Sequence, residues 1–369
     1  MKDKLPDVVA SVFAPLIQAS GRTDLADKLR TEKIDASEQE QQYKRYNSVK
    51  LLGTNAAHLP GGGFLCLYEH ADGRYLAFSV PNLNEADEQH VTDWSVKLGF
   101  EQENIDQSTF LFLCHYLRDL YSIKPAYRKL SAAADVLDVL GDDYQGHAFS
   151  DLIDFYQTVY VFRVPADNAL YDADVSHHGF NLCCSFSGAR SRIITQQINA
   201  AVIELGTYEH IPKDNLFQAL TANLSRHYFL EMYRCIEALY YFPWVLELKD
   251  KGGIASTVSE LKEYCRTTLN WREREEPSIR KIFGSVTLDG ATTALEKEIE
   301  LFKTFLNSRD FKRESLGKEI YRIRNNLVHH EDYENPQRID FTVQQWEQLS
   351  IYVTLILLCY SREHSQDFS

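Results

Sequence analysis

The spacing of apolar residues changes at about residue 215 of this 369-residue chain. From there to residue 240, apolar side chains recur every three or four positions, the spacing that gathers them on one face of an α-helix: Leu216, Leu220, Leu224, Tyr228, Met232, Ile236 and Leu239. Pro243 interrupts or ends this helix, because proline lacks a backbone donor and its ring clashes with the preceding turn. Helical spacing returns four times afterwards, which predicts an all-α C-terminal part with helices near 258–269, 293–306, 315–329 and 343–360.

The residues before this change follow a mixed pattern. After a helical opening, residues 64–80 read as two β-strands joined at Asp72-Gly73, a dipeptide that accepts the positive φ angles of a tight hairpin turn. Further strand-like runs lie at 158–164 and 180–186, and helical runs at 109–121 and 130–140. Short strands that alternate with helices predict a mixed α+β N-terminal domain.

The length of the chain favours two domains, since 369 residues exceed one comfortable hydrophobic core. The loop 208–214 contains Pro212 and several charges and separates the two patterns. The predicted fold class is therefore α+β, with a mixed α+β domain over residues 1–210 followed by an all-α helical bundle over residues 211–369.

Composition narrows the class of protein. With 44% hydrophobic and 25% charged residues the chain reads as an ordinary globular protein. We expect it to be cytoplasmic and without membrane contact, because the N-terminus lacks a signal-peptide pattern and the late apolar run 351–360 is too short to span a bilayer. Seven cysteines without a CxxC pair predict reduced, mostly buried thiols.

The net charge of −14 argues against coating of nucleic acid by a basic surface. The acidic excess belongs to the N-terminal part, because residues 215–369 carry 20 Lys+Arg against 23 Asp+Glu. A nucleic-acid site in the C-terminal part therefore needs only a local basic cluster, and Lys318, Arg322 and Arg324 supply one.

This cluster belongs to the segment YRIRNNLVHHEDY, residues 321–333, in which Arg324 is followed by Asn325 and, after three more residues, by His329. At about 100° per residue on a helix, the apolar stripe contains Ile320, Ile323 and Leu327, and the polar side contains Lys318, Arg322, Asn325 and His329. Arg324 projects between the two sides. The spacing alone leaves two interpretations open, a solvated helix face and a functional site.

The segment resembles the HEPN superfamily, small helical domains of many ribonucleases in toxin and antiphage systems. The family pattern is an Arg, four to six residues and a His, with a polar residue often directly after the Arg. Arg324-Asn325 with His329 matches best, and Arg322 with His329 or Arg324 with His330 fit more loosely. The resemblance covers about residues 215–369 and is nearest to the Apea-like branch. It implies a composite active site at the interface of a homodimer.

RNA cleavage without a metal needs an acid, a base and positive charge on the developing phosphorane. His329 suits the first two roles, because imidazole titrates near neutral pH. Arg324 suits the third, because guanidinium is always charged and forks onto phosphate oxygens. Asn325 would bind a phosphate oxygen or hold the imidazole, while Lys318 and Arg322 would bind the substrate. One motif per chain supplies one His, so we expect a homodimer through the C-terminal bundle.

The leading hypothesis is thus a metal-independent endoribonuclease that acts on RNA without a cofactor. The HEPN resemblance alone implies its role in bacterial defence or growth arrest. Its N-terminal domain would sense a protein or phage-derived trigger, control the nuclease or select its target. Two alternatives remain open: a non-catalytic HEPN module that binds RNA, a nucleotide or a partner protein, and a structural dimerisation protein. Arg324 and His329 are expected to serve chemistry and not folding.

Other groups of residues are weaker site candidates. The acidic cluster Asp135, Asp138, Asp142 and Asp143 fits a solvated helix end better than a magnesium site. Arg234 and Glu237, three positions apart on one predicted helix, could orient Arg324 or His329, but an ordinary intrahelical ion pair is the favoured interpretation and their roles stay unassigned. His177-His178 with Cys183-Cys184 contain metal-ligand residue types, but adjacent duplicates lack the separated pairs of a structural zinc site. No metal site is therefore predicted.

Overall fold

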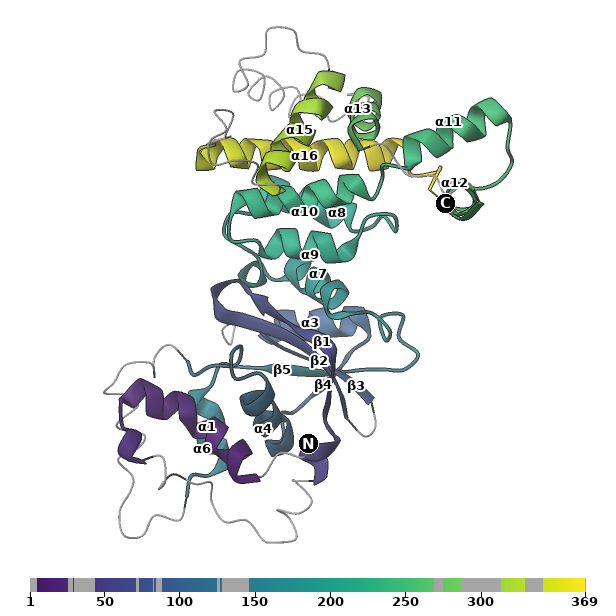
Figure 1. The fold of residues 1–369 in the computed structure, drawn as a ribbon. Helices are drawn as coiled ribbons and strands as arrows, with labels where there is room; N and C mark the ends of the chain where they lie inside the picture. Colours follow the sequence, from purple (N-terminus) through teal and green to yellow (C-terminus); the bar gives the residue numbers. More distant parts are fainter. Residues whose placement is uncertain are drawn as a thin grey trace. The chain divides into compact units, whose positions relative to one another are not determined.

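The computed structural model divides into two compact units, residues 1–189 and 190–369, which are treated separately below (Figure 1). The structure describes residues 5–25, 29, 44–70, 73–81, 83, 88–124, 127, 146–268, 275–286, 313–328 and 341–368.

The first unit is built on an antiparallel sheet of five strands in the order β1-β2-β3-β5-β4. Strands β2 and β3 pair from Phe64 opposite Ser79 to His70 opposite Gly73, which confirms the predicted hairpin. Strand β5 confirms the strand predicted at 158–164, whereas β1 and β4 were not predicted. The bounds are Lys50–Leu59 for β1, Gly63–His70 for β2, Gly73–Ser79 for β3, Glu101–Glu103 for β4 and Tyr160–Val164 for β5.

Helices cover both faces of this sheet, so alternate residues of each strand enter different cores. Phe64, Cys66 and Tyr68 pack with helices α1, α4 and α6. On the other face, Phe78 lies in edge contact with Trp94 of α3, with ring centroids 5.4 Å apart, and helix α7 packs on β1 and β2. The helices span Leu5–Ser20 for α1, Glu88–Leu98 for α3, Gln107–Tyr116 for α4, Phe149–Phe155 for α6 and Val175–Ser185 for α7.

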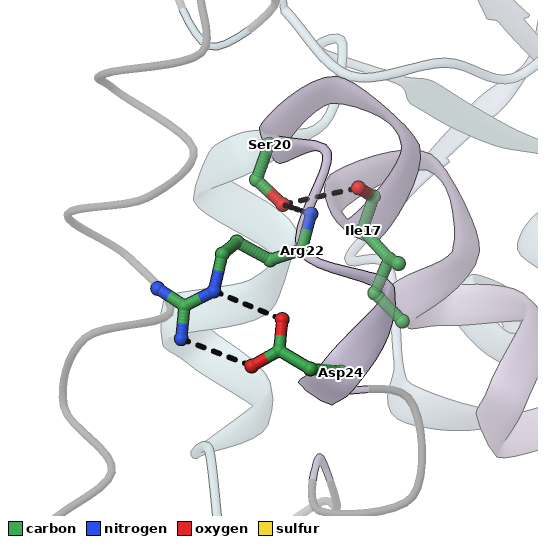
Figure 2. Close-up of polar contacts among 4 residues, drawn as sticks. All are labelled: Ile17, Ser20, Arg22 and Asp24. Carbon is green, nitrogen blue, oxygen red and sulfur yellow. Dashed lines mark hydrogen bonds and ion pairs between the residues drawn. The ribbon is translucent and has the colours of Figure 1, made fainter.

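The end of α1 shows how local chemistry stops a helix (Figure 2). The Ser20 hydroxyl donates to the Ile17 carbonyl at 3.0 Å and accepts from the Arg22 backbone N–H at 3.2 Å. Gly21, at φ 69°, supplies the left-handed turn that follows a helix end. The Arg22 guanidinium then binds the Asp24 carboxylate at 3.0 and 3.3 Å, in the 3₁₀ turn Thr23–Leu25.

The second unit is helical in the ranges that the structure describes, and its longest described helix, α16, packs against α8, α10 and α13 (Figure 1). The Tyr228 and Thr354 hydroxyls hydrogen-bond at 2.7 Å between α10 and α16. Helix bounds are Gln196–Leu205 for α8, Lys213–Thr221 for α9, Ser225–Glu237 for α10, Phe242–Gly252 for α11, Val258–Thr268 for α12, Glu275–Ser285 for α13, Arg313–Val328 for α15 and Val343–Glu363 for α16.

Several predicted elements are confirmed and others are wrong. Helices α12, α15 and α16 match the helices predicted at 258–269, 315–329 and 343–360. The long helix predicted after residue 215 is instead broken before α10, because Ala222 is extended at ψ 126° and ends α9. Pro243 lies in the first turn of α11, where its missing N–H costs nothing. The helices predicted at 130–140 and 293–306 lie outside the described residues.

The run 180–186, predicted as a strand, belongs to helix α7. The Asp174 carboxylate accepts from the His177 backbone N–H at 2.9 Å and caps the helix N-terminus, a local signal that outweighs the apolar run. The helix predicted at 109–121 is present as α4 but ends at Tyr116.

The division between the units also differs from the predicted boundary at 210/211, since it falls between Ala189 and Arg190. The reason is helix α8, which packs against α16. The Arg362 guanidinium of α16 binds the Glu204 carboxylate of α8 at 2.5 and 2.6 Å. In the parts of the chain described here, no helix combines the length and apolar character needed to cross a membrane.

Candidate functional site

Helix α15 carries the Arg-Asn motif and is held by its apolar side. Ile320 and Ile323 of the predicted apolar stripe are fully buried, as is Leu316 one turn earlier, whereas Leu327 of that stripe is only half-buried. The helix approaches α13 closely at Gly317, where an added Cβ would lie 3.0 Å from the Arg280 Cα. This close packing of two backbones fixes the position of the motif helix.

Arg324 extends from α15 toward α10. Its Nη2 donates to Glu237 Oε1 at 2.7 Å and its Nη1 donates to Asn325 Oδ1 at 2.9 Å. The guanidinium carbon also lies 5.6 Å from the centroid of the Tyr233 ring. The Arg324 side chain is 19% exposed, so the group is partly sheltered and still reachable. We call Arg324, Asn325, Glu237 and Tyr233 the Arg324 site.

The surroundings of Glu237 make it an unusual carboxyl group. Its partial burial, with the nearby Glu275 carboxylate of α13, raises its pKa above the ordinary value, while Arg324 opposes this rise. The contact with Arg324 therefore stabilises the ionised form of Glu237, which partial burial and Glu275 destabilise. Such opposed influences on one group are typical of functional sites, although structural ion pairs show them too.

Two tyrosines close the inner side of the Arg324 site. The Tyr233 and Tyr240 hydroxyls hydrogen-bond to each other, and both side chains are buried. Burial raises the pKa of both phenols, so they remain protonated at neutral pH. They offer neutral O–H groups and an aromatic face beside the guanidinium.

The predicted site residues are only partly brought together. Asn325 contacts Arg324 and is half-buried. Arg322 donates instead to Glu319 of its own helix at 2.8 Å, and Lys318 is exposed. Within the described ranges, no contact joins either of these two cations to Arg324. His329, the predicted acid or base, lies outside the described residues, as does His330.

The pair Arg234 and Glu237 turns out to have separate partners. Arg234 donates to Glu231, three residues earlier on α10, at 2.7 Å and is largely exposed. Glu237 binds Arg324 across the helices. An intrahelical ion pair, the favoured interpretation, is thus present at Arg234, but with Glu231 in place of Glu237. Glu237 makes its ion pair with another helix.

Sequence reasoning missed the two tyrosines, although a signal was present. Tyr233 and Glu237 are spaced i and i+4, which places them on one face of α10, and Tyr240 follows in the turn after that helix. Polar atoms on the same side as buried apolar residues need partners in the fold. A search for such polar positions would have indicated this face of α10.

The other constellations do not form a site. Among the residues that the structure describes, no group of three or more His, Cys, Asp or Glu could hold a metal ion. His178 is buried in α7, and burial, assisted by His177, lowers its pKa to about 4. The Cys183 thiol donates to the Ala189 carbonyl at 3.2 Å in the core. The acidic residues at 135–143 lie outside the described residues.

Comparison of the chain with models of protein families, with curated proteins and with solved structures gave no significant match. The chemistry of the Arg324 site, with the resemblance of its motif, therefore carries the functional argument.

Proposed function

We propose that the chain is an endoribonuclease that cleaves RNA without a metal ion, through attack of the substrate's own 2′-hydroxyl on the adjacent phosphate. The observation that carries the proposal is the fixed guanidinium of Arg324, held by Glu237 from α10 and by Asn325 from α15. A cation held in advance stabilises charge that develops in the transition state without reorganising at that moment.

The remaining donors of Arg324 support a contact with phosphate. Guanidinium has five N–H groups, and among the described residues its hydrogen bonds go to Glu237 and Asn325. Further N–H groups therefore remain for a phosphate oxygen. Glu237 would act as a positioning residue, because it touches the guanidinium and not the reacting atoms.

His329 supplies the proton transfer in this proposal. In the sequence it directly follows Val328, the last residue of α15. One imidazole per chain provides an acid or a base but not both. A symmetric homodimer through the second unit would bring two imidazoles and two guanidinium groups to one composite site.

The wider role follows from the resemblance of the motif to HEPN ribonucleases. We assign the chain to bacterial defence or growth arrest, with the first unit responding to a protein or phage-derived trigger. A non-catalytic module that binds RNA, a nucleotide or a partner protein would use the same cation without His329, so measurement of cleavage separates the two functions.

The test is cleavage of total RNA by the purified full chain in EDTA, with light scattering on the same sample. We expect a dimer, fragments that end in 2′,3′-cyclic phosphate and 5′-hydroxyl, and a loss of about two decades or more in rate for His329→Ala. His330→Ala is the matched control and should cleave nearly normally. The assay is repeated with phage-infected cell extract, which supplies the proposed trigger.

Three results would contradict the proposal. An active His329→Ala protein would assign the proton transfer to another residue. Fragments with 5′-phosphate would indicate attack by water in place of the 2′-hydroxyl. A stable monomer with and without RNA would exclude the composite site.

A further inference from the structure

A cleft of about 390 Å³ lies among helices α11, α13 and α16 of the second unit. Its volume is within the range of small-molecule sites, about 300–1,000 Å³. None of the residues of the Arg324 site lines it. The cleft is therefore a separate feature of the helical unit.

Two ammonium groups converge on one point of the cleft. Lys251 Nζ lies 2.5 Å from Glu247 Oε1, and Lys281 binds the other oxygen of the same carboxylate. The Lys281 ammonium also lies 4.0 Å from the centroid of the Trp244 ring, which holds it in place through a cation–π contact. An anionic group at this point can contact both lysines at once.

Glu247 now occupies the anion position. Hydrogen bonds from Lys251 and Lys281 lower its pKa to about 2, so it is a carboxylate at neutral pH. Both ion pairs are partly exposed, and pairs of this kind contribute little to stability. A ligand anion can therefore exchange with the Glu247 carboxylate at low cost.

Apolar and aromatic side chains also line the cleft. Pro243 and Leu246 line it from α11, the Tyr360 ring lines it from α16, and the His364 ring lines it from the residue directly after α16. These two rings lie 4.7 Å apart, and His364 Nδ1 lies 3.1 Å from Asp367 Oδ2, a contact that sets the ring orientation. The lining thus combines two ammonium groups with apolar and ring surfaces, as a flat molecule with one anionic end requires, and it also contains the Asp250 carboxylate, which an incoming anion must avoid.

We propose that this cleft binds a phosphate monoester that carries a flat ring, the class to which nucleoside monophosphates belong. The phosphate lies between Lys251 and Lys281, and the ring lies against Pro243 and Leu246. Lysine binds phosphate as a point charge, and two such charges on one phosphate give stronger contacts than those with a carboxylate. This inference stands independently of the proposed ribonuclease activity.

The experiment is calorimetric titration of the full chain with AMP, CMP, phenyl phosphate and inorganic phosphate. We expect one molecule of AMP per chain and weaker binding of inorganic phosphate, which lacks the ring. Equal binding of inorganic phosphate and AMP would overturn the ring subsite, and no binding of AMP or phenyl phosphate would overturn the proposal as a whole.

Variants with opposite signs make the test specific. Lys281→Gln should weaken AMP binding about tenfold or more, because it removes one phosphate contact. Glu247→Gln should strengthen AMP binding roughly several-fold. The substitution removes the carboxylate that competes for the two lysines and leaves the size of the side chain unchanged. Lys249→Gln is the matched control and should leave AMP binding unchanged. Lys249 lies on α11 with Glu247 and Lys251 but does not line the cleft.

Thermal melting of each variant shows whether the fold survives. If Lys281→Gln melts at a lower temperature than the parent protein, Lys251→Gln takes its place in the titration. Weaker binding in Glu247→Gln would contradict the proposed exchange of anions. Loss of AMP binding in Arg324→Ala, with Lys281→Gln unaffected, would place the ligand in the Arg324 site and overturn the assignment to the cleft.

Discussion

Glu237 of α10 accepts a hydrogen bond of 2.7 Å from Arg324 of α15, and this contact ties two helices that are far apart in sequence. The pair is only partly exposed, at 28% for Glu237 and 19% for Arg324. The motif arginine is thus a structural partner as well as the proposed charge-stabilising group. This dual role changes the expectation that Arg324 serves chemistry alone.

Arg324→Ala is expected to lower both cleavage and stability. Loss of a charge-stabilising contact costs about 10² to 10³ in rate. The same change leaves Glu237 partly buried without its cation, which costs roughly 1–3 kcal/mol in the free energy of unfolding. Urea denaturation and RNA cleavage measure the two effects.

A double-mutant cycle separates the two roles of the arginine. The double variant Arg324→Ala, Glu237→Ala should be more stable than Arg324→Ala alone, since no charge of the pair is then left without its partner. It should not regain cleavage. Additive losses of stability in the double variant would show that the contact between the two side chains contributes nothing measurable.

Glu237→Gln is expected to retain much of the function of the parent protein, whereas Glu237→Ala is not. Glutamine keeps an oxygen that accepts from Arg324, and alanine removes it. A displaced catalytic group can cost about 10² in rate, so Glu237→Ala should lower kcat more than it raises KM.

Arg234→Gln is the control for Glu237, because Arg234 lies on the same helix and is largely exposed, and its partner Glu231 keeps the hydrogen bond from Asn215 at 2.8 Å. Its loss should change stability by only a few tenths of a kcal/mol. If Glu237→Ala cleaves as fast as Arg234→Gln, Glu237 has no positioning role.

The sequence could predict the parts of the fold that depend on local pattern. The hairpin of β2 and β3 and the helices α12, α15 and α16 follow from spacing and turn residues. Helix α7 was mistaken for a strand because the cap at Asp174 lies outside the apolar run from which the strand was inferred. Helix α8 lies in the second compact unit and before the predicted boundary, because its partner, Arg362 of α16, is far away in sequence.

The candidate site was predictable to a similar degree. The motif pattern identified Arg324 and Asn325, but their orientation depends on packing between helices. Glu237 could be named as a possible partner of Arg324 but not assigned to it. Its spacing of three residues from Arg234 fits an ion pair on one helix equally well. The polar positions Tyr233 and Glu237 on one face of α10, with Tyr240 in the turn that follows, were the observation needed.

Acid should loosen the packing around the end of the chain through His210. The Phe368 ring stacks on His210 with centroids 3.5 Å apart, and His210 Nε2 lies 3.2 Å from the Ser361 hydroxyl. Burial, assisted by the Lys213 ammonium, lowers the pKa of His210 from 6.5 to about 4. The folded protein therefore favours the neutral ring.

The sign of the pH dependence follows from this shift. A histidine with a lowered pKa contributes its full stability above the unfolded value, about 6.5, and this stability is lost as the pH falls toward 4. His210→Phe keeps the ring stack and cannot titrate. The parent protein should therefore lose more unfolding free energy than His210→Phe between pH 7 and pH 5, as measured by urea denaturation. Parallel losses would exclude His210 as the cause.

Gly317→Ala tests whether the close approach of α13 and α15 positions the Arg324 site. In an ordinary helix this change stabilises by up to about 1 kcal/mol. Here the new Cβ would lie 3.0 Å from the Arg280 Cα and from the Ile279 carbonyl oxygen, and these backbone atoms cannot rotate away. Overpacking of this kind costs roughly 1–3 kcal/mol, so we expect a net loss of stability.

Lys318→Ala, at the next and exposed position of α15, is the control and should change the unfolding free energy by less than about 0.5 kcal/mol. A shift of α15 away from α13 would also move Arg324 relative to Glu237. Gly317→Ala should therefore cleave RNA more slowly than Lys318→Ala at temperatures where both proteins are folded. Equal stability and equal cleavage in the two variants would mean that the helices separate without cost, and that the position of Arg324 is set elsewhere.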